Sequence, residues 1–174
     1  DQIVDRILQR LAAADPGSAF GAAFLTGADK PHAIQTGIDT GQQRPVPLAK
    51  DHVGCIGIEV GKTLGNLPIY DAVILGMGLD GHTASIFPCA DANQLNASLT
   101  TKKSALFIDP TTAEFRRLTQ SVSRLRNTRF GAIHIEGTEK KVVLDAAKES
   151  LDNPRYPVSY FVGGNSSFEI YFSE

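Results

Sequence analysis

The chain has 174 residues, of which 42% are hydrophobic and 21% are charged, and its formal net charge is −2. These values are typical of one soluble globular domain, here spanning 1–174, and they exclude a global positive field that would attract nucleic acid or an anionic membrane. Cys55 and Cys89 show neither metal-ligand spacing nor a disulfide framework, so we expect two free thiols in a reducing compartment, with pairing of the two as the alternative. No apolar run approaches the ~20 residues that span a bilayer and the N-terminus does not resemble a signal peptide, so a cytoplasmic protein is expected. The opening residues DQIVDRILQRLAAA carry apolar side chains at helical spacing and predict a helix over 1–14.

The next elements follow in chain order. AAFLT at 22–26 is an apolar run that predicts a short buried strand. Residues 27–49 are rich in Gly, Pro, Gln and Thr and indicate an extended surface connection. Residues 51–65 have a loose helical pattern despite three glycines, so we expect a helix there.

The run Ala72–Leu75 is continuously apolar, as a strand buried on both faces of a parallel sheet requires. Further strands are predicted at 104–109, 130–137, 158–163 and 168–173, with a helix at 138–150, and 117–125 alternates like a strand and then turns. Strands that alternate with helices predict an α/β fold, a Rossmann-like layered arrangement with a largely parallel sheet flanked by helices.

The segment LGMGLDGHTASIFP (75–88) leaves the end of the strand at 72–75. Ligands of open α/β sheets bind outside the carboxyl ends of their strands. Gly76, Gly78 and Gly81 allow the backbone to approach a ligand closely, and its N–H groups are candidate donors to an oxyanion. Asp80 and His82 lie two residues apart on the same turn, and an imidazole transfers protons near neutral pH.

Other interpretations of this segment remain open from the residues alone. The three glycines give the spacing G-x-G-x-x-G, but the acidic residue that a dinucleotide site requires about 20 residues later is not evident. A single histidine is more often a surface or hydrogen-bonding residue than a catalyst. Asp80 has the alternative role of capping the turn or the following helix.

The whole segment closely resembles the catalytic loop of 6-phosphogluconolactonases, which reads LGMGxDGHTASLFP, with one Ile-for-Leu exchange and a variable position at Leu79. FRRLTQS (115–121), GTEK (137–140), YPV (156–158) and FEIY (168–171) resemble later segments of that family. The resemblance is good from about residue 50 onward. Family members commonly begin with further β/α units, including a Gly/Ser-rich phosphate loop, so this chain resembles their C-terminal part and is either truncated or divergent.

The resemblance implies hydrolysis of 6-phosphoglucono-δ-lactone, a phosphorylated sugar lactone, without metal or organic cofactor. It implies that His82 is the general base, that Asp80 orients the site, and that Gly76, Gly78 and Gly81 contact the substrate. It also implies that Arg117 and Lys140 bind the phosphate. Lys140 has a second argument in its favour, since a helix N-terminus attracts anions.

Several alternatives accompany this reading. The related amino-sugar phosphate isomerase/deaminases carry a Glu five residues after the His, where this chain has Phe87, and a non-catalytic phosphosugar-binding fragment is the other alternative function.

Several residues also have alternative roles. Arg116 is the alternative to Arg117 as the phosphate ligand, and Lys140 has the alternative of a solvated helix residue beside Lys141. Arg124, Arg126 and Arg129 are interpreted as a solvated basic face, and His134 as a packed strand residue. The sequence does not fix the oligomeric state.

Overall fold

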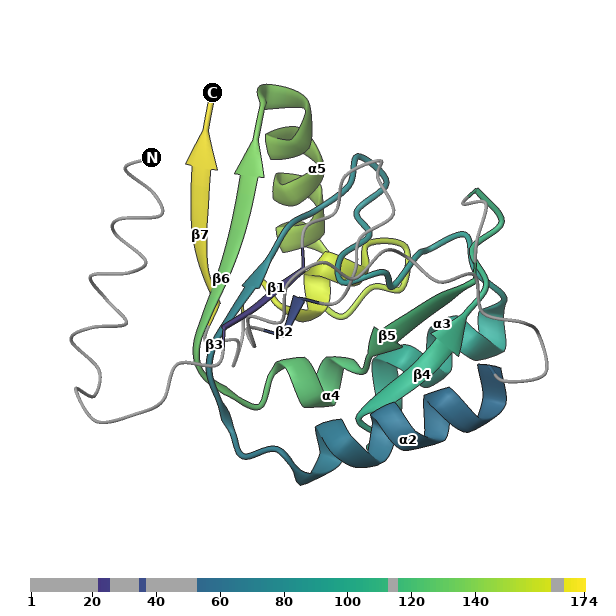
Figure 1. The fold of residues 1–174 in the computed structure, drawn as a ribbon. Helices are drawn as coiled ribbons and strands as arrows, with labels where there is room; N and C mark the ends of the chain where they lie inside the picture. The colour runs from purple at the N-terminus through teal and green to yellow at the C-terminus, as the bar shows by residue number, and fades with distance from the viewer. Residues whose placement is uncertain (1–21, 26–34, 37–52, 113–115, 164–167) are drawn as a thin grey trace.

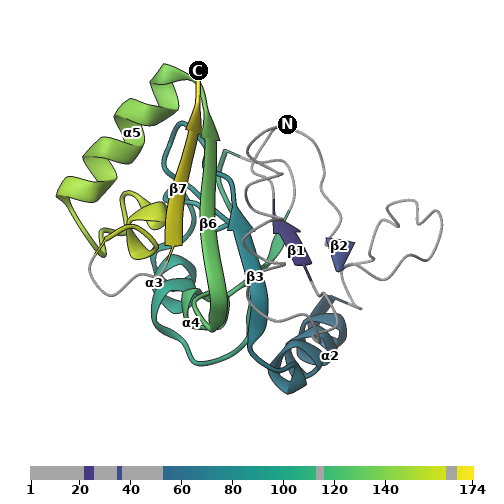
Figure 2. The same cartoon turned by 90° about the vertical axis from the view of Figure 1, so that its left-hand side faces the viewer.

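The computed structural model describes residues 22–25, 35–36, 53–112, 116–163 and 168–174. Its main sheet has five strands in the order β2-β1-β3-β6-β7 (Figures 1 and 2). The strands are β1 (Ala22–Leu25), β2 (Gln35–Thr36), β3 (Tyr70–Leu75), β6 (Thr128–Glu136) and β7 (Phe168–Ser173). Each of the pairs β1–β3, β3–β6 and β6–β7 is parallel, and only β2 runs antiparallel to its neighbour. The predicted α/β fold with a largely parallel sheet is therefore confirmed.

The predicted strand at 72–75 is the centre of this sheet. Val73 and Leu75 are fully buried, and they belong to the same core as Ile133 and Ile135 of β6. Leu75 is in register with Ile133, so the two strands deliver their carboxyl ends to the same edge of the sheet. This arrangement fixes where the segment after Leu75 leaves the fold.

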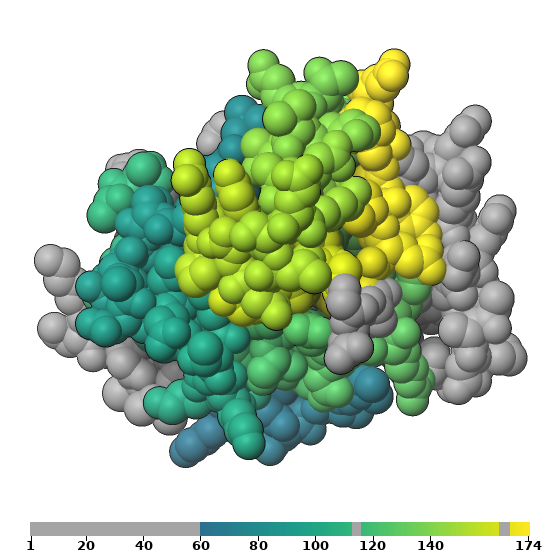
Figure 3. Space-filling view, turned by 180° about the vertical axis from the view of Figure 1, so that it is seen from behind, coloured from purple at the N-terminus to yellow at the C-terminus, as the bar shows by residue number. Residues whose placement is uncertain are grey.

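Helices cover the sheet and connect its strands. They are α2 (Val53–Asn66), α3 (Ala92–Thr100), α4 (Val122–Leu125), α5 (Thr138–Glu149) and the 3₁₀ helix η2 (Pro157–Tyr160). Leu144 and Ala147 of α5 are spaced three residues apart, so they lie on one helix face, and both are buried in the core. From behind, α5 and the segment after it cover the middle of the described molecule, beside β7 (Figure 3). None of the described helices combines the length and apolar character that crossing a membrane would require.

The predicted strands at 104–109 and 117–125 do not join the main sheet. β4 (Ala105–Ile108) and β5 (Arg117–Gln120) form a separate antiparallel pair, with Ile108 opposite Arg117. The turn predicted at the end of 117–125 is the short helix α4, which begins after Ser121, where the Ser121 side chain accepts a hydrogen bond from the N–H of Arg124.

The prediction of a strand at 158–163 is wrong, because the chain forms η2 there. Pro157 stands at the start of this helix, where its fixed φ is favourable and its missing N–H costs nothing. The turn is closed by the Phe161 N–H, which donates to the Val158 carbonyl oxygen at 2.9 Å. It places three apolar side chains in the core, those of Val158, Phe161 and Val162. An apolar run therefore reached the core without strand pairing.

Two sequence-based expectations lie outside the described residues, namely the opening helix at 1–14 and most of the connection at 27–49. Helix α3 was not predicted. Its N-cap is Asp91, whose carboxylate accepts from the N–H groups of Asn93 and Gln94, and it buries Leu95 and Leu99 at helical spacing.

Candidate active site

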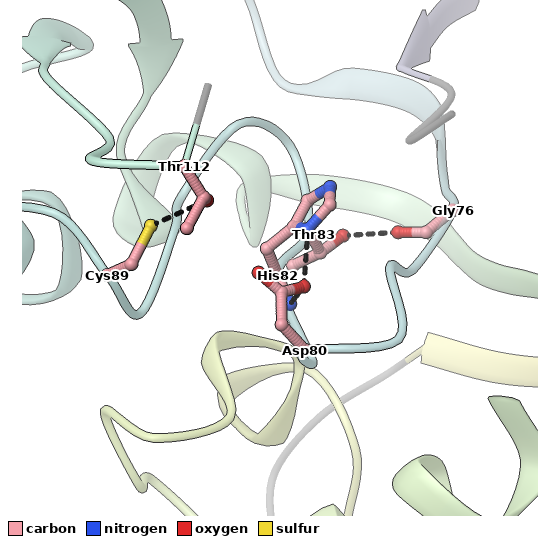
Figure 4. Close-up of polar contacts among 6 residues, drawn as sticks. All are labelled: Gly76, Asp80, His82, Thr83, Cys89 and Thr112. Atoms are coloured by element: carbon pink, nitrogen blue, oxygen red, sulfur yellow. Dashed lines mark hydrogen bonds and ion pairs between the residues drawn. The ribbon is translucent and has the colours of Figure 1, made fainter. Parts of the chain in front are cut away.

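The glycine-rich segment after β3 folds into a loop that is closed by its own hydrogen bonds. The Gly78 N–H donates to the His82 carbonyl oxygen at 3.0 Å, and the Gly81 N–H donates to the Gly78 carbonyl oxygen at 3.0 Å. The buried Thr83 hydroxyl donates to the Gly76 carbonyl oxygen at 2.7 Å (Figure 4). The amides of Gly78 and Gly81 thus donate inside the loop, while the role of the amides from Gly76 to Gly81 toward an oxyanion or substrate stays a prediction.

The loop then reverses direction at Ala84 and Ser85, which have φ angles of 50° and 61°. Two consecutive left-handed residues form a tight turn, and the Ile86 N–H closes it by donating to the Thr83 carbonyl oxygen at 2.8 Å. Non-glycine residues rarely adopt this conformation, so neighbouring structure must hold the turn. Thr119 of β5 contributes by donating from its hydroxyl to the Ala84 carbonyl oxygen at 2.5 Å. Sequence reasoning missed Thr119, because only the folded chain brings β5 to this loop.

His82 and Asp80 contact each other directly, as Figure 4 shows. Nδ1 of His82 lies 2.5 Å from Oδ1 of Asp80, and the backbone N–H of His82 donates to the same oxygen at 3.1 Å. Burial by itself would raise the pKa of Asp80, but the hydrogen bonds from the His82 side chain and backbone outweigh it and hold this pKa below its ordinary value. Asp80 is therefore a carboxylate at neutral pH and accepts a hydrogen bond from the Nδ1–H of His82. In neutral His82 the lone pair is then on Nε2, the atom that a general base uses.

The surroundings of the imidazole fix its plane. The His82 ring stacks on the Phe87 ring, with centroids 4.3 Å apart and an interplanar angle of 28°. Gly78 also lies directly against the imidazole, since a Cβ built there would overlap the His82 ring and approach Oδ1 of Asp80 to 2.8 Å. The imidazole side chain is 19% exposed, so it is held by the protein and still reaches solvent.

The segment around η2 packs against the same loop. Gly81 has a φ of 79°, and a Cβ there would come within 2.8 Å of the Tyr156 side chain. The Val158 N–H donates to the Gly81 carbonyl oxygen at 3.1 Å. Gly81 is required for this close approach and for its left-handed backbone, which gives it a structural role beyond any contact with substrate.

The two arginines at the start of β5 have different surroundings. Arg116 donates to both carboxylate oxygens of Asp109, from Nε at 2.6 Å and from Nη2 at 2.8 Å. Arg117 has no such partner among the described residues, and its Nε is buried without a hydrogen bond. Arg117 and Thr119 lie on the same face of β5 because side chains alternate along a strand, and Thr119 contacts the loop that carries His82. Of the two arginines, Arg117 is thus the one without a carboxylate partner in the described part of the chain.

Lys140 is half-buried in the first turn of α5, which leaves the carboxyl end of β6. Because β6 is parallel to β3 and next to it, this helix start lies at the same sheet edge as the loop after Leu75 (Figure 1). Lys141 is paired with Asp145 at 2.6 Å, whereas no ion pair involves Lys140 in the described part of the chain. Gly137 precedes α5 without a side-chain cap, so the first-turn amides retain their attraction for an anion, which Glu139 in the same turn opposes.

Other polar features near the loop are less informative. Cys89 is a free thiol whose Sγ lies 3.0 Å from the Thr112 hydroxyl (Figure 4). Partial burial opposes the hydrogen bonds from Thr112 and Thr111, but the net effect lowers the pKa of Cys89. Within the described ranges, no group of three His, Cys, Asp or Glu residues is arranged to hold a metal ion. Two depressions on the described surface lie elsewhere, and neither is bordered by His82, Arg117 or Lys140.

Comparison with known proteins gives a consistent result. The family of glucosamine-6-phosphate isomerases and 6-phosphogluconolactonase matches residues 32–169, which is more than half of the chain. A 6-phosphogluconolactonase from Rhizobium meliloti is 35% identical over 120 residues, covering 67% of this chain and 52% of that protein. One from Neisseria meningitidis is 36% identical over 89 residues, covering 51% of this chain and 38% of that protein.

The fold agrees with the sequence match. The crystal structure of a 6-phosphogluconolactonase from Shewanella baltica superposes with a TM-score of 0.62 and 34% identity, covering 67% of this chain and 50% of that chain. The chain spans about half the length of the relatives it matches, or less. With the sequence match extending across the catalytic loop, β5 and α5, the chain belongs to the glucosamine-6-phosphate isomerase/6-phosphogluconolactonase family.

Proposed function

We propose that this chain carries the catalytic loop of a 6-phosphogluconolactonase, which hydrolyses 6-phosphoglucono-δ-lactone to 6-phosphogluconate in the cytoplasmic pentose phosphate pathway. The observation that carries the proposal is the hydrogen bond between Nδ1 of His82 and the ionised Asp80, because it leaves Nε2 as a proton acceptor on a partly exposed ring. The relatives named above, all 6-phosphogluconolactonases, support the choice of reaction.

In the proposed reaction, Nε2 of His82 takes a proton from water while the water oxygen bonds to the lactone carbonyl carbon. The carbonyl oxygen becomes an oxyanion in the tetrahedral intermediate. This intermediate collapses by breaking the bond between the carbonyl carbon and the ring oxygen, which takes the proton back from His82. The products are a carboxylic acid and a hydroxyl group, and no oxidant or metal is required. Such proton transfer typically accelerates a reaction by about 10²–10⁴-fold.

Asp80 supports both steps, since its carboxylate orients the ring and stabilises the imidazolium that forms between them. With the amides of Gly78 and Gly81 engaged inside the loop, we assign those glycines, together with Gly76, to shaping the surface that the substrate approaches. The substrate phosphate is assigned to Arg117 and Lys140, which lack carboxylate partners among the described residues while Arg116 and Lys141 have them.

The isomerase/deaminase alternative receives less support from this site. That family carries a Glu five residues after the histidine, and here that position is Phe87, whose ring stacks on His82. An apolar ring at this contact excludes water from one face of the imidazole and supplies no acid or base.

The test is whether the full chain hydrolyses the lactone faster than the spontaneous rate, measured by pH-stat titration of the acid released. We expect His82→Gln to lose the acceleration, by about 10²-fold or more, while the thermal midpoint stays near that of the unsubstituted chain. Equal hydrolysis by the two proteins would remove His82 as the base. Phosphosugar binding by a chain that never accelerates hydrolysis would favour the non-catalytic alternative, and deamination of an amino-sugar phosphate would favour the isomerase.

A further inference from the structure

A second polar site lies at the opposite end of β3 from His82. A surface depression of about 510 Å³ is bordered by the end of α2, the residues before β4, and α4. Its polar lining consists of Lys102, Ser104, Ser123, Arg124, Arg126 and Asn127. Leu67, which precedes the amino end of β3, also borders it, whereas the catalytic loop follows the carboxyl end of the same strand. Six residues of extended strand separate the two ends by roughly 20 Å.

The depression is strongly basic. Three of its lining residues are cations, and no acidic residue is among the described residues that border it. Arg129, which is close in sequence, is paired with Asp71 at 2.7 Å and takes no part. Arg126 also borders a neighbouring depression that contains Asp152, but no ion pair joins these two side chains. The positive charges of this depression, which we call the basic depression, are therefore not neutralised by the described part of the protein.

Arg124 is the informative member of the group. It is only 6% exposed, which corrects the interpretation of this arginine as part of a solvated face. Its Nη2 donates to the carbonyl oxygen of Pro68 at 2.9 Å and more weakly to that of Leu67 at 3.4 Å, and its guanidinium carbon lies 3.9 Å from the centroid of the Tyr70 ring.

These contacts position the guanidinium and do not neutralise it. No carboxylate among the described residues pairs with Arg124, and its Nε is buried without a hydrogen-bond partner. Burying an uncompensated charge is unfavourable unless a counter-ion is present. A buried, rigidly held cation that lines a depression with two further cations is the arrangement of an anion site.

We propose that the basic depression binds a phosphate group, either as inorganic phosphate or as the phosphate of a small ester. Lys102 and Arg126 supply charge from its rim, and the Ser104 and Ser123 hydroxyls and the Asn127 amide are additional donors for the phosphate oxygens. This site is independent of His82 and of the proposed lactone hydrolysis.

The test is NMR titration of the full chain with inorganic phosphate at constant ionic strength, with sodium chloride as the reference salt. We expect phosphate to shift the amide signals of Ser104, Ser123 and Asn127, and Lys102→Gln and Arg126→Gln each to raise the dissociation constant by about tenfold. Lys103→Gln is the matched control, because Lys103 is an exposed lysine beside Lys102 that does not border the depression. It should bind like the unsubstituted chain.

Two further arms separate this site from the candidate active site. Arg117→Gln should leave the phosphate-dependent shifts at Ser104 and Ser123 unchanged. Titration with glucose 6-phosphate in place of inorganic phosphate distinguishes an ester from the free ion. The proposal is overturned if phosphate shifts only signals of the catalytic loop, if chloride produces the same shifts, or if Lys102→Gln and Arg126→Gln bind phosphate as tightly as Lys103→Gln.

Discussion

The hydroxyl of Thr119 donates a hydrogen bond to the carbonyl oxygen of Ala84, which lies 35 residues earlier in the chain. Ala84 is the first of two left-handed residues, so this bond joins β5 to the least favourable backbone of the catalytic loop. The same strand face carries Arg117. One side chain thereby ties the loop that holds His82 to the strand that begins with Arg117, which we propose binds the substrate phosphate.

Replacing Thr119 with Val should therefore release the turn at Ala84. The lost hydrogen bond is expected to cost about 1 kcal/mol of unfolding free energy, and kcat should fall more than KM rises because the base is displaced. Thr119→Ser retains the hydroxyl and should restore most of kcat. Urea denaturation and steady-state kinetics on the same preparations measure both effects, and equal kcat for the Val and Ser variants would separate this bond from catalysis.

Gly78→Ala places a methyl group where the His82 ring and the Asp80 carboxylate lie. We expect lactone hydrolysis to fall by about tenfold or more, because a displacement of this size in a catalytic group is costly. Gly61→Ala, inside α2, is the matched control, since outside the helix its Cβ meets nothing closer than the backbone oxygen of Ala105 at 4.0 Å. That control should keep full activity and gain up to about 1 kcal/mol of stability from helix propensity. Full activity of Gly78→Ala would contradict the observed packing.

The neighbouring arginines of β5 should respond differently to the same substitution. Arg117→Gln is expected to raise KM for the phosphorylated lactone by about 10–100-fold, the worth of one charged hydrogen bond. Arg116→Gln should leave KM unchanged and lower stability by at most about 1 kcal/mol, because its ion pair with Asp109 is on the surface. The reverse pattern of KM values would assign the phosphate to Arg116.

Asp80→Asn tests the orientation of the base. The amide cannot stabilise the imidazolium that forms during the reaction, so kcat should fall by about 10–100-fold with little change in KM. Asp91→Asn is the control, because Asn caps a helix as well as Asp does and Asp91 caps α3. Unchanged kcat in Asp80→Asn would show that Asp80 has no part in catalysis.

Acid stability should depend on Asp109. The pKa of Asp109 lies below its ordinary value of 3.8, mainly because Arg116 donates hydrogen bonds to the carboxylate and, to a smaller extent, because Gln94 does. A carboxyl group whose pKa is depressed on folding stabilises the fold fully above its unfolded pKa, and this contribution is lost as the pH falls through the folded pKa. Asp109→Asn should therefore lose stability less steeply than the unsubstituted chain below about pH 4, as urea midpoints at pH 2–5 would measure. Because the pair is exposed, the difference should stay within about 1 kcal/mol, and parallel midpoints for the two proteins would contradict the assignment.

Continuous apolar runs predicted strands correctly where the run pairs with a neighbouring strand of the sheet, as at Ala72–Leu75 and 130–137. The run at 158–163 is also largely buried, but it follows Pro157, whose fixed φ favours a helical turn, and the chain forms a 3₁₀ helix there instead of a strand. Helix α3 escaped prediction because only Leu95 and Leu99 mark its buried face in a polar stretch. The sequence identifies no strand partners for short runs, which is why β4 and β5 were not expected to form a sheet of their own.

For the candidate site, the sequence was sufficient for the residues that are adjacent in the chain. His82 and Asp80 are only two residues apart in the chain, and the glycines around them predict a tight loop that brings the two side chains together. The choice between Arg116 and Arg117 required the register of β5 and the location of Asp109, neither of which a pattern provides. The roles of the predicted site residues, and the assignment of 1–174 to one domain, stay predictions.

The imidazole and the carboxylate that orients it are both carried by one short turn, closed by the bond from Gly78 to the His82 carbonyl oxygen. A rigid shift of that turn would carry both groups together. Changes elsewhere in the fold should therefore leave the tautomer of His82 unaffected, whereas they can change the distance of His82 from Arg117 and Lys140. If the proposed function holds, substitutions outside this turn should consequently change substrate binding more than the proton acceptor of His82.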